Sequence, residues 1–120
     1  MAESSEQAEV IKWLRETYPE YAKSIRSSMN GLPRHGRQGS ILWNIMKGQG
    51  CSKGEPDFAL LLPKGGFGCL VVEHKGEGME HKLSTEQIEH LEYHEGIGNC
   101  AVSTRGVEAF KAAIVAYLEG

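Results

Sequence analysis

The stretch Gly54-Glu55-Pro56-Asp57, followed sixteen residues later by Glu73-His74-Lys75, decides how this chain folds. Two apolar runs lie between these motifs, residues 58–62 and 69–72, and the Gly- and Pro-rich residues 63–68 join them. Each run has the length of a strand and the joining segment is typical of a turn, so the pattern predicts a β-hairpin. Asp57 then begins the first strand, and Glu73 and Lys75 end the second. All three side chains are expected at one end of the hairpin.

Side-chain alternation divides the last residues of the second strand between the two faces of the sheet. Glu73 and Lys75 project to one face, whereas His74 projects to the other, where a helix is expected to cover it. Two carboxylates and an ammonium group therefore converge. Proteins bind Mg²⁺ through one or two carboxylates together with waters and substrate phosphates. This end of the hairpin is a candidate metal site, although charged residues also occur at strand ends simply because water solvates them.

These motifs resemble those of the PD-(D/E)xK nuclease superfamily, and within it those of the VRR-NUC family of virus-type replication-repair nucleases. In that family a Gly-x-Pro-Asp opens the second core strand, a Glu-x-Lys ends the third, and a Gln follows at the start of the next helix. Residues 54–57, residues 73–75 and Gln87 match these features in the same order. The resemblance extends from about residue 3 to the end of the sequence.

The resemblance implies an α/β, restriction-endonuclease-like core, with a central mixed β-sheet flanked by helices on both faces. The residue pattern predicts a compatible order: helix, strand, short helix, two strands, helix, strand, helix. Helices are expected over residues 3–18, 41–47, 85–95 and 107–118, and a strand outside the hairpin over residues 99–104. The resemblance implies a further strand over residues 24–29. Residues 20–30 are ambiguous, because they would suit a helix equally well. At 120 residues, the chain is expected to form a single VRR-NUC-like nuclease domain over residues 1–120.

The resemblance also implies roles for the residues of the hairpin. Asp57 and Glu73 are expected to bind Mg²⁺ or Mn²⁺ through their carboxylates, and the main-chain carbonyl of His74 is expected to complete the protein ligands. Lys75 is expected to orient the attacking water and to stabilise charge that develops on the phosphate.

Two further candidates for the catalytic site lie on helices. Gln87 could orient water or the scissile strand, but it could also form a capping box with Ser84. VRR-NUC proteins commonly carry a Glu in the first helix, and Glu3 matches the family pattern best. Glu3 is therefore the candidate helix-borne acid and a candidate ligand of a second metal ion, with Glu6 and Glu9 as alternatives. An acid in a first helical turn also has a structural explanation, since it interacts favourably with the helix dipole.

Charge is distributed unevenly along the chain. The net charge is −3, yet residues 21–54 contain six Lys or Arg residues and no Asp or Glu. Local positive charge favours binding to nucleic acid, because each neutralised phosphate releases counterions. The alternative is a basic surface that is only solvated and has no partner. The candidate DNA-binding residues in this segment are Arg34, Arg37, Lys47 and Lys53.

Other features of the sequence narrow the class of protein. No apolar run is long enough to span a membrane, and the first residues do not resemble a signal peptide. The three cysteines include no Cys-x-x-Cys pair, which indicates a reducing compartment. We therefore expect a cytoplasmic protein without a membrane partner, and the resemblance implies a bacterial or phage-infected cell.

The activity implied by the resemblance is that of a divalent-metal-dependent DNA endonuclease. Small VRR-NUC domains resemble phage-encoded enzymes that act as homodimers on branched DNA, including four-way (Holliday) junctions. Two sites on a twofold dimer would suit symmetric cuts in a junction. The alternatives are a nicking or restriction-like nuclease on duplex or single-stranded DNA, a catalytically silent nucleic-acid-binding module, and a metal-binding regulatory protein. The intact Asp57, Glu73 and Lys75 argue against the silent module.

Overall fold

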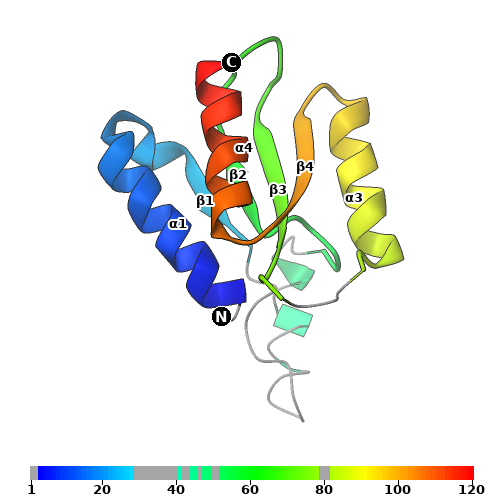
Figure 1. Cartoon of the computed structure of the whole chain (residues 1–120). Helices are drawn as coiled ribbons and strands as arrows, with labels where there is room; N and C mark the ends of the chain where they lie inside the picture. Colours follow the sequence, from blue (N-terminus) through cyan, green and yellow to red (C-terminus); the bar gives the residue numbers. More distant parts are fainter. Residues whose placement is uncertain (1–2, 29–40, 42–43, 46, 50–51, 79–81) are drawn as a thin grey trace.

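The computed structural model describes residues 3–28, 41, 44–45, 47–49, 52–78 and 82–120, without the side chains of residues 3 and 4. Its elements, all but η1 labelled in Figure 1, are α1 (Glu3–Thr17), the 3₁₀ helix η1 (Pro19–Ser24), β1 (Ile25–Ser27), β2 (Phe58–Leu60), β3 (Leu70–Lys75), α3 (Thr85–Gly96), β4 (Cys100–Arg105) and α4 (Val107–Glu119). Apart from η1, this order agrees with the predicted one; of the short helix predicted over 41–47, only residues 41, 44–45 and 47 are described, and these are helical. No helix within the described ranges is long and apolar enough to cross a lipid bilayer.

The strands form one mixed sheet in the order β1-β2-β3-β4 (Figure 1). β2 pairs antiparallel with both β1 and β3, whereas β4 is parallel to β3 and is reached through α3. The predicted hairpin is therefore confirmed, but its first strand ends at Leu60 rather than at Leu62. It ends there because Leu62 donates its main-chain N–H back to the carbonyl of Leu60, at 2.9 Å, just before Pro63. Phe58 lies opposite Val72, and the same register puts Asp57 opposite Glu73.

Residues 20–30, which were ambiguous in sequence, contain both kinds of structure. The 3₁₀ helix η1 occupies residues 19–24, and β1 follows immediately over three residues. Pro19 begins η1, where its missing N–H removes no helical hydrogen bond. β1 pairs with β2 from Ile25 opposite Leu60 to Ser27 opposite Phe58, so the neighbouring strand fixes its conformation.

Helices α1 and α4 cover one face of the sheet (Figure 1), and the hydrophobic core lies between that face and these two helices. Phe58 from β2 and Phe110 from α4 meet edge to face there, with ring centroids 5.2 Å apart. The buried side of α1 contains Val10 and Leu14, whereas Ala8 is exposed. The buried stripe of α1 also includes a charged residue, Glu6.

The opposite face of the sheet is covered in part by α3, which packs against β3 and β4 (Figure 1). Gly54 allows the chain before β2 to pass close to the first turn of this helix. Its φ is +81°, and an added Cβ would lie 2.6 Å from the Cβ of Glu86 and 2.8 Å from the main-chain nitrogen of Gln87. Only glycine suits both the positive φ and the close approach. Gly54 therefore brings the segment that leads to Asp57 against the start of α3.

Candidate functional site

The candidate site lies where β2 begins and β3 ends. The Oδ2 atom of Asp57 accepts a 2.9 Å hydrogen bond from the main-chain N–H of His74. The main-chain carbonyl of Asp57 accepts two more, from the N–H of Ser28 at 2.9 Å and from Nε2 of Gln7 at 3.2 Å. Both the backbone and the carboxylate of Asp57 are therefore fixed beside Glu73.

Glu73 supplies a second carboxylate, which is almost fully buried at 2% exposure. A buried charge is costly unless it is hydrogen-bonded, paired or bound to a metal. Nε2 of Gln87 donates a 3.2 Å hydrogen bond to Oε2 of Glu73. Nζ of Lys75 donates to Oε1 of the same amide at 3.4 Å, which is a long contact. The amide of Gln87 therefore connects Glu73 and Lys75, which project from the same face of β3.

The side chain of Gln87 also completes the N-terminal cap of α3. Oγ of Ser84 accepts the N–H of Gln87 at 3.1 Å, and Oε1 of Gln87 accepts the N–H of Ser84 at 2.8 Å. The predicted capping box is thus confirmed. From the sequence, a helix cap and a place in the candidate site were competing interpretations of Gln87. In the structure, its side-chain amide contacts the main chain of Ser84 and also the side chains of Glu73 and Lys75. The cap holds this amide beside the strand-borne residues.

His74 lies on the opposite face of the sheet, as side-chain alternation predicted. Its side chain is 1% exposed, and its ring centroid is 4.7 Å from that of Phe110. Nε2 of the imidazole is 2.8 Å from Oε1 of Glu6, and Nδ1 is 2.9 Å from Oγ1 of Thr104. Oε2 of Glu6 accepts the main-chain N–H of Glu77 at 3.0 Å. Four segments of the chain are thus joined by one buried hydrogen-bond network.

The carboxylate of Glu6 is the charged centre of this network. Burial alone would raise the pKa of Glu6, but the hydrogen bonds from the Glu77 N–H and from His74 bring this pKa below its usual value. The carboxylate of Glu6 is therefore ionised at neutral pH, and it accepts a hydrogen bond from the Nε2–H of His74. The helix-borne acid predicted for the site was Glu3, which begins α1 and whose side chain lies outside the described part. Glu6, named as an alternative, contacts His74 rather than the carboxylates of Asp57 and Glu73.

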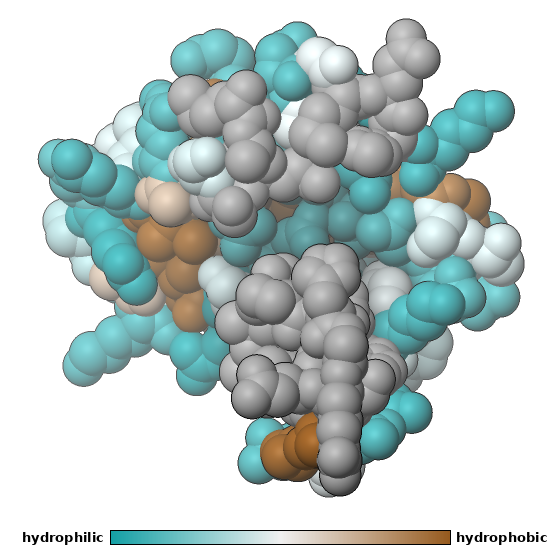
Figure 2. Space-filling model, turned by 90° about the horizontal axis from the view of Figure 1, so that it is seen from below, coloured by the Kyte–Doolittle hydropathy of each residue, from teal (hydrophilic) through white to brown (hydrophobic). Residues whose placement is uncertain are grey.

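The candidate DNA-binding residues are only partly covered by the structure. Arg34 and Arg37 lie outside the described residues. Lys47 is exposed, and the exposed Lys53 has its Nζ 3.4 Å from Oε1 of Glu86. An ion pair at the surface contributes little free energy, so Lys53 can exchange Glu86 for another anion. The end of the molecule that carries the N-terminus of α1 is shown face-on in Figure 2, and its described surface is mostly hydrophilic.

The donor atoms at this end of the hairpin fit a hard divalent cation. Asp57 and Glu73 are opposite in register, and the Cβ atoms of such cross-strand pairs lie about 5 Å apart. Carboxylate and carbonyl oxygens are the ligands that Mg²⁺ takes, with water in the remaining positions. No group of three or more His, Cys, Asp or Glu side chains that could hold a metal occurs among the described residues. Asp57 and Glu73 could supply two carboxylates and leave other positions open for water and substrate.

Comparison with known proteins supports the fold. No protein-family model matches the sequence, and the search of curated proteins found no match. Among solved structures, the chain is similar to a VRR_NUC domain protein, with a TM-score of 0.78 and 21% sequence identity. The similarity covers 99% of this chain and 89% of that chain. The predicted α/β fold of VRR-NUC type, with a mixed sheet between helices, is therefore confirmed.

Proposed function

We propose that this chain is a divalent-metal-dependent DNA endonuclease that hydrolyses phosphodiester bonds. The observation that carries this proposal is the convergence of Asp57, Glu73 and Lys75 at one end of the hairpin. Asp57 is held by a main-chain N–H of β3, and Glu73 and Lys75 are both hydrogen-bonded to one amide of α3. Three charged groups held by such contacts on a VRR-NUC fold favour catalysis over simple solvation of a strand end.

The proposed mechanism assigns a task to each of these side chains. Asp57, Glu73 and the main-chain carbonyl of His74 would hold Mg²⁺ or Mn²⁺, which when bound acts as a Lewis acid and lowers the pKa of a bound water. Lys75 carries a compact positive charge, with which it orients the attacking water and stabilises charge developing on the phosphate. Gln87 contacts both Glu73 and Lys75, so it keeps their side chains in position.

The basic segment over residues 21–54 is the proposed contact surface for the DNA backbone. It runs directly into the motif that ends at Asp57, so its positive charge is adjacent in sequence to the catalytic carboxylate. We assign Arg34, Arg37, Lys47 and Lys53 as phosphate contacts, because neutralising phosphates is the main source of affinity for DNA. Glu3, at the start of α1, remains the proposed acid for a second metal ion.

We propose branched DNA, such as a four-way (Holliday) junction, as the substrate, and a homodimer as the acting form. Two active sites related by a twofold axis would place matching cuts on two strands of a junction. This assignment of substrate follows the resemblance to small VRR-NUC nucleases, and it is consistent with a role in DNA repair in a bacterial or phage-infected cell. A nicking or restriction-like nuclease on duplex or single-stranded DNA is the second candidate.

A cleavage panel tests this function. A four-way junction, a flap, a duplex and a single strand, each end-labelled, are incubated with the protein in Mg²⁺, in Mn²⁺ and in excess chelator. We expect cleavage of the junction that depends on the metal and stops with chelator. Cleavage of all substrates would support the chemistry and favour the second candidate. Salt-sensitive binding without cleavage in either metal would contradict the endonuclease and favour a binding module.

The two roles of Gln87 can be separated with a pair of variants. Ser84→Ala removes the cap but keeps the amide of Gln87, so we expect a loss of about 1 kcal/mol in the free energy of unfolding and nearly unchanged cleavage. Gln87→Ala should lower stability by a similar amount and also lower the cleavage rate about 10- to 100-fold, because Glu73 and Lys75 lose a shared partner. Chemical denaturation and single-turnover cleavage measure the two effects. Equal cleavage by both variants would show that Gln87 is only a cap.

A further inference from the structure

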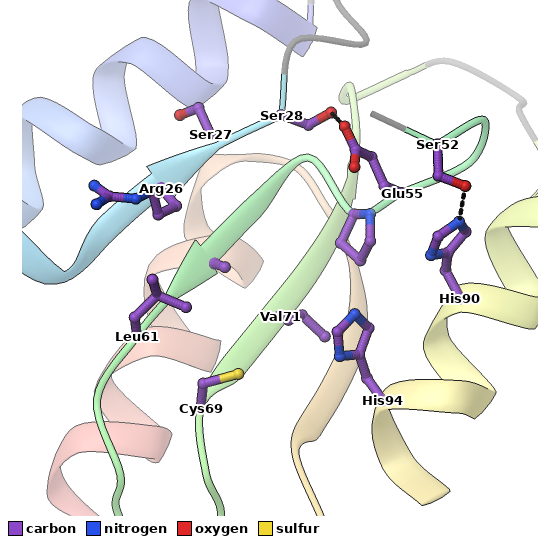
Figure 3. A pocket seen from close by; sticks show the side chains of 12 residues that line it. Arg26, Ser27, Ser28, Ser52, Glu55, Leu61, Cys69, Val71, His90 and His94 are labelled. Carbon is purple, nitrogen blue, oxygen red and sulfur yellow. Dashed lines mark hydrogen bonds between the residues drawn. The ribbon is translucent and has the colours of Figure 1, made fainter. Parts of the chain in front are cut away.

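A hollow lies on the same face of the sheet as the candidate catalytic side chains, beside α3 (Figure 3). Its volume is about 390 Å³, which is within the range of small-molecule sites. Apolar groups from β2, β3 and the residue after β2 line it, namely Ala59, Val71 and Leu61, and His90 and His94 of α3 form its other wall. Ser28, Ser52 and Glu55 add polar atoms, and Figure 3 shows them on the segments that lead into and out of the sheet.

The hollow lies farther along α3 than the candidate catalytic site. Gln87 contacts Glu73, and His90 and His94 follow it at intervals that keep all three on one side of the helix. Seven residues of helix span about 10 Å, so His94 lies about that far along the axis from Gln87. On β3, Val71 and Glu73 project from the same face. Val71 lines the floor of the hollow, so this floor lies beside the carboxylate of Glu73. A strand whose phosphate lies at Asp57 and Glu73 therefore has a neighbouring nucleotide next to this hollow.

The walls combine flat aromatic surfaces with hydrogen-bonding groups. Nδ2 of Asn99 lies 3.0 Å from Nδ1 of His94, and since the amide nitrogen can only donate, the neutral imidazole carries its proton on Nε2. Burial lowers the pKa of His94, and the nearby His90 lowers it further, so this ring is neutral at neutral pH. Nε2 of His90 is 3.1 Å from Oγ of Ser52 (Figure 3). Each ring thus has a hydrogen-bonding partner that orients it, Asn99 for His94 and Ser52 for His90.

We propose that this hollow receives an unpaired nucleobase of the DNA strand bound at the candidate catalytic site. An unstacked base is a flat ring with donors and acceptors on its edge, and proteins bind such bases by stacking on side chains that include His and by hydrogen bonds to that edge. A paired base in continuous duplex is stacked on its neighbours, so it does not enter. The hollow therefore selects DNA with an unpaired or easily opened base beside the cut. This inference rests on the proposed nuclease function.

A fluorescence experiment tests the inference without cleavage. The full-length Asp57→Asn variant, with Mg²⁺, is titrated into four-way junctions that carry the fluorescent base 2-aminopurine at one position each around the cut. We expect a change in fluorescence on binding at one position, where the base leaves the stack, and not at its neighbours. Ala59→Met fills the floor of the hollow from a half-buried site on β2, and combined with Asp57→Asn it should abolish this change. Ala112→Met, at an exposed position of α4, is the matched control and should keep it.

Cleavage of modified DNA gives a second readout that needs no variant. A junction with an abasic nucleotide at the responding position should be cut about tenfold more slowly by the wild-type protein, since stacking of one base contributes on that scale. Ala59→Met should slow cleavage of the normal junction to a similar degree and have little further effect on the abasic one.

The outcomes separate this inference from the proposed function. If the wild-type protein cuts DNA but no position responds and the abasic junction is cut at the normal rate, the inference is overturned and the nuclease stands. If Ala59→Met instead changes the sedimentation of the protein without changing the fluorescence, the hollow is an interface between two copies and the inference is again overturned. If the wild-type protein neither binds nor cuts any of the DNAs, both proposals fail.

Discussion

Asp57→Asn is expected to lower the cleavage rate by about 10³-fold or more while leaving DNA affinity and stability nearly unchanged. The carboxylate is a proposed metal ligand, and a bound metal stabilises the transition state by several kcal/mol, with each 1.36 kcal/mol worth about a factor of ten. Asparagine has the same shape, and its Oδ1 can still accept the N–H of His74, so the end of the hairpin should keep its structure. Single-turnover cleavage and a binding titration under the same conditions measure the two quantities.

Matched variants make this test specific to the site. Glu73→Gln and Lys75→Ala should show the same pattern, with cleavage lost and binding kept, because they change the other two proposed catalytic groups. Glu108→Gln makes the same change of charge as Glu73→Gln at an exposed position of α4, and it should cut DNA like the wild-type protein. If Asp57→Asn lost binding and cleavage together while remaining folded, the assignment of Asp57 as a catalytic ligand would be wrong.

The strand-borne part of the site could be predicted from sequence because local rules determine it. The turn between the two apolar runs sets which residues face each other, and alternation sets the face to which each side chain points. Those two rules were enough to bring Asp57, Glu73 and Lys75 to one end of the hairpin and to put His74 beneath the helices. β1 was harder to predict, because a strand of three residues gains its conformation from pairing with β2 rather than from its own composition.

The helix-borne acid could not be identified in the same way, because its burial depends on distant partners. Glu6 is buried since it bonds to His74, which is sixty-eight residues away, and to the main chain of Glu77. A charged residue at a core position departs from the usual apolar stripe of an amphipathic helix, so the sequence pattern alone did not mark Glu6 as buried. One signal was present: Glu6 precedes Val10 and Leu14 at four-residue intervals, which puts all three on one side of the helix.

Removal of the Glu6 carboxylate is expected to have the largest effect on stability. Glu6→Ala should lower the free energy of unfolding by about 3–5 kcal/mol, because it breaks a buried pair and leaves His74 and the N–H of Glu77 without their acceptor. Glu16→Ala, at an exposed position of the same helix, is the control and should change stability by less than about 0.5 kcal/mol. Urea denaturation at neutral pH measures both. A small loss for Glu6→Ala would contradict the buried network.

The lowered pKa of Glu6 predicts how its contribution to the free energy of unfolding depends on pH. Above the usual carboxyl pKa of 4.5, Glu6 is ionised in both the folded and the unfolded chain, so its stabilisation is fully present. As the pH falls below 4.5, the unfolded chain takes up the proton first, and the stabilisation is lost until the pH passes the lower pKa of the folded state. Glu6→Gln cannot titrate, so its stability should fall less steeply with acid than that of the wild-type protein. Parallel acid curves for the two proteins would exclude Glu6 as the group responsible.

The double variant Glu6→Leu/His74→Leu separates the stability of this network from its effect on the site. Apolar residues of similar size often replace buried, hydrogen-bonded charged and polar groups without loss of stability, so the double variant should recover most of what Glu6→Ala loses. The main chain at position 74 would keep the N–H that binds Asp57 and the carbonyl proposed as a metal ligand, but the side chain would no longer fix its position. We therefore expect cleavage to fall about 10- to 100-fold even where stability returns. If stability and the cleavage rate both recovered fully, the network would only fill the core. If stability alone recovered, α1 would position the catalytic end of the hairpin through His74.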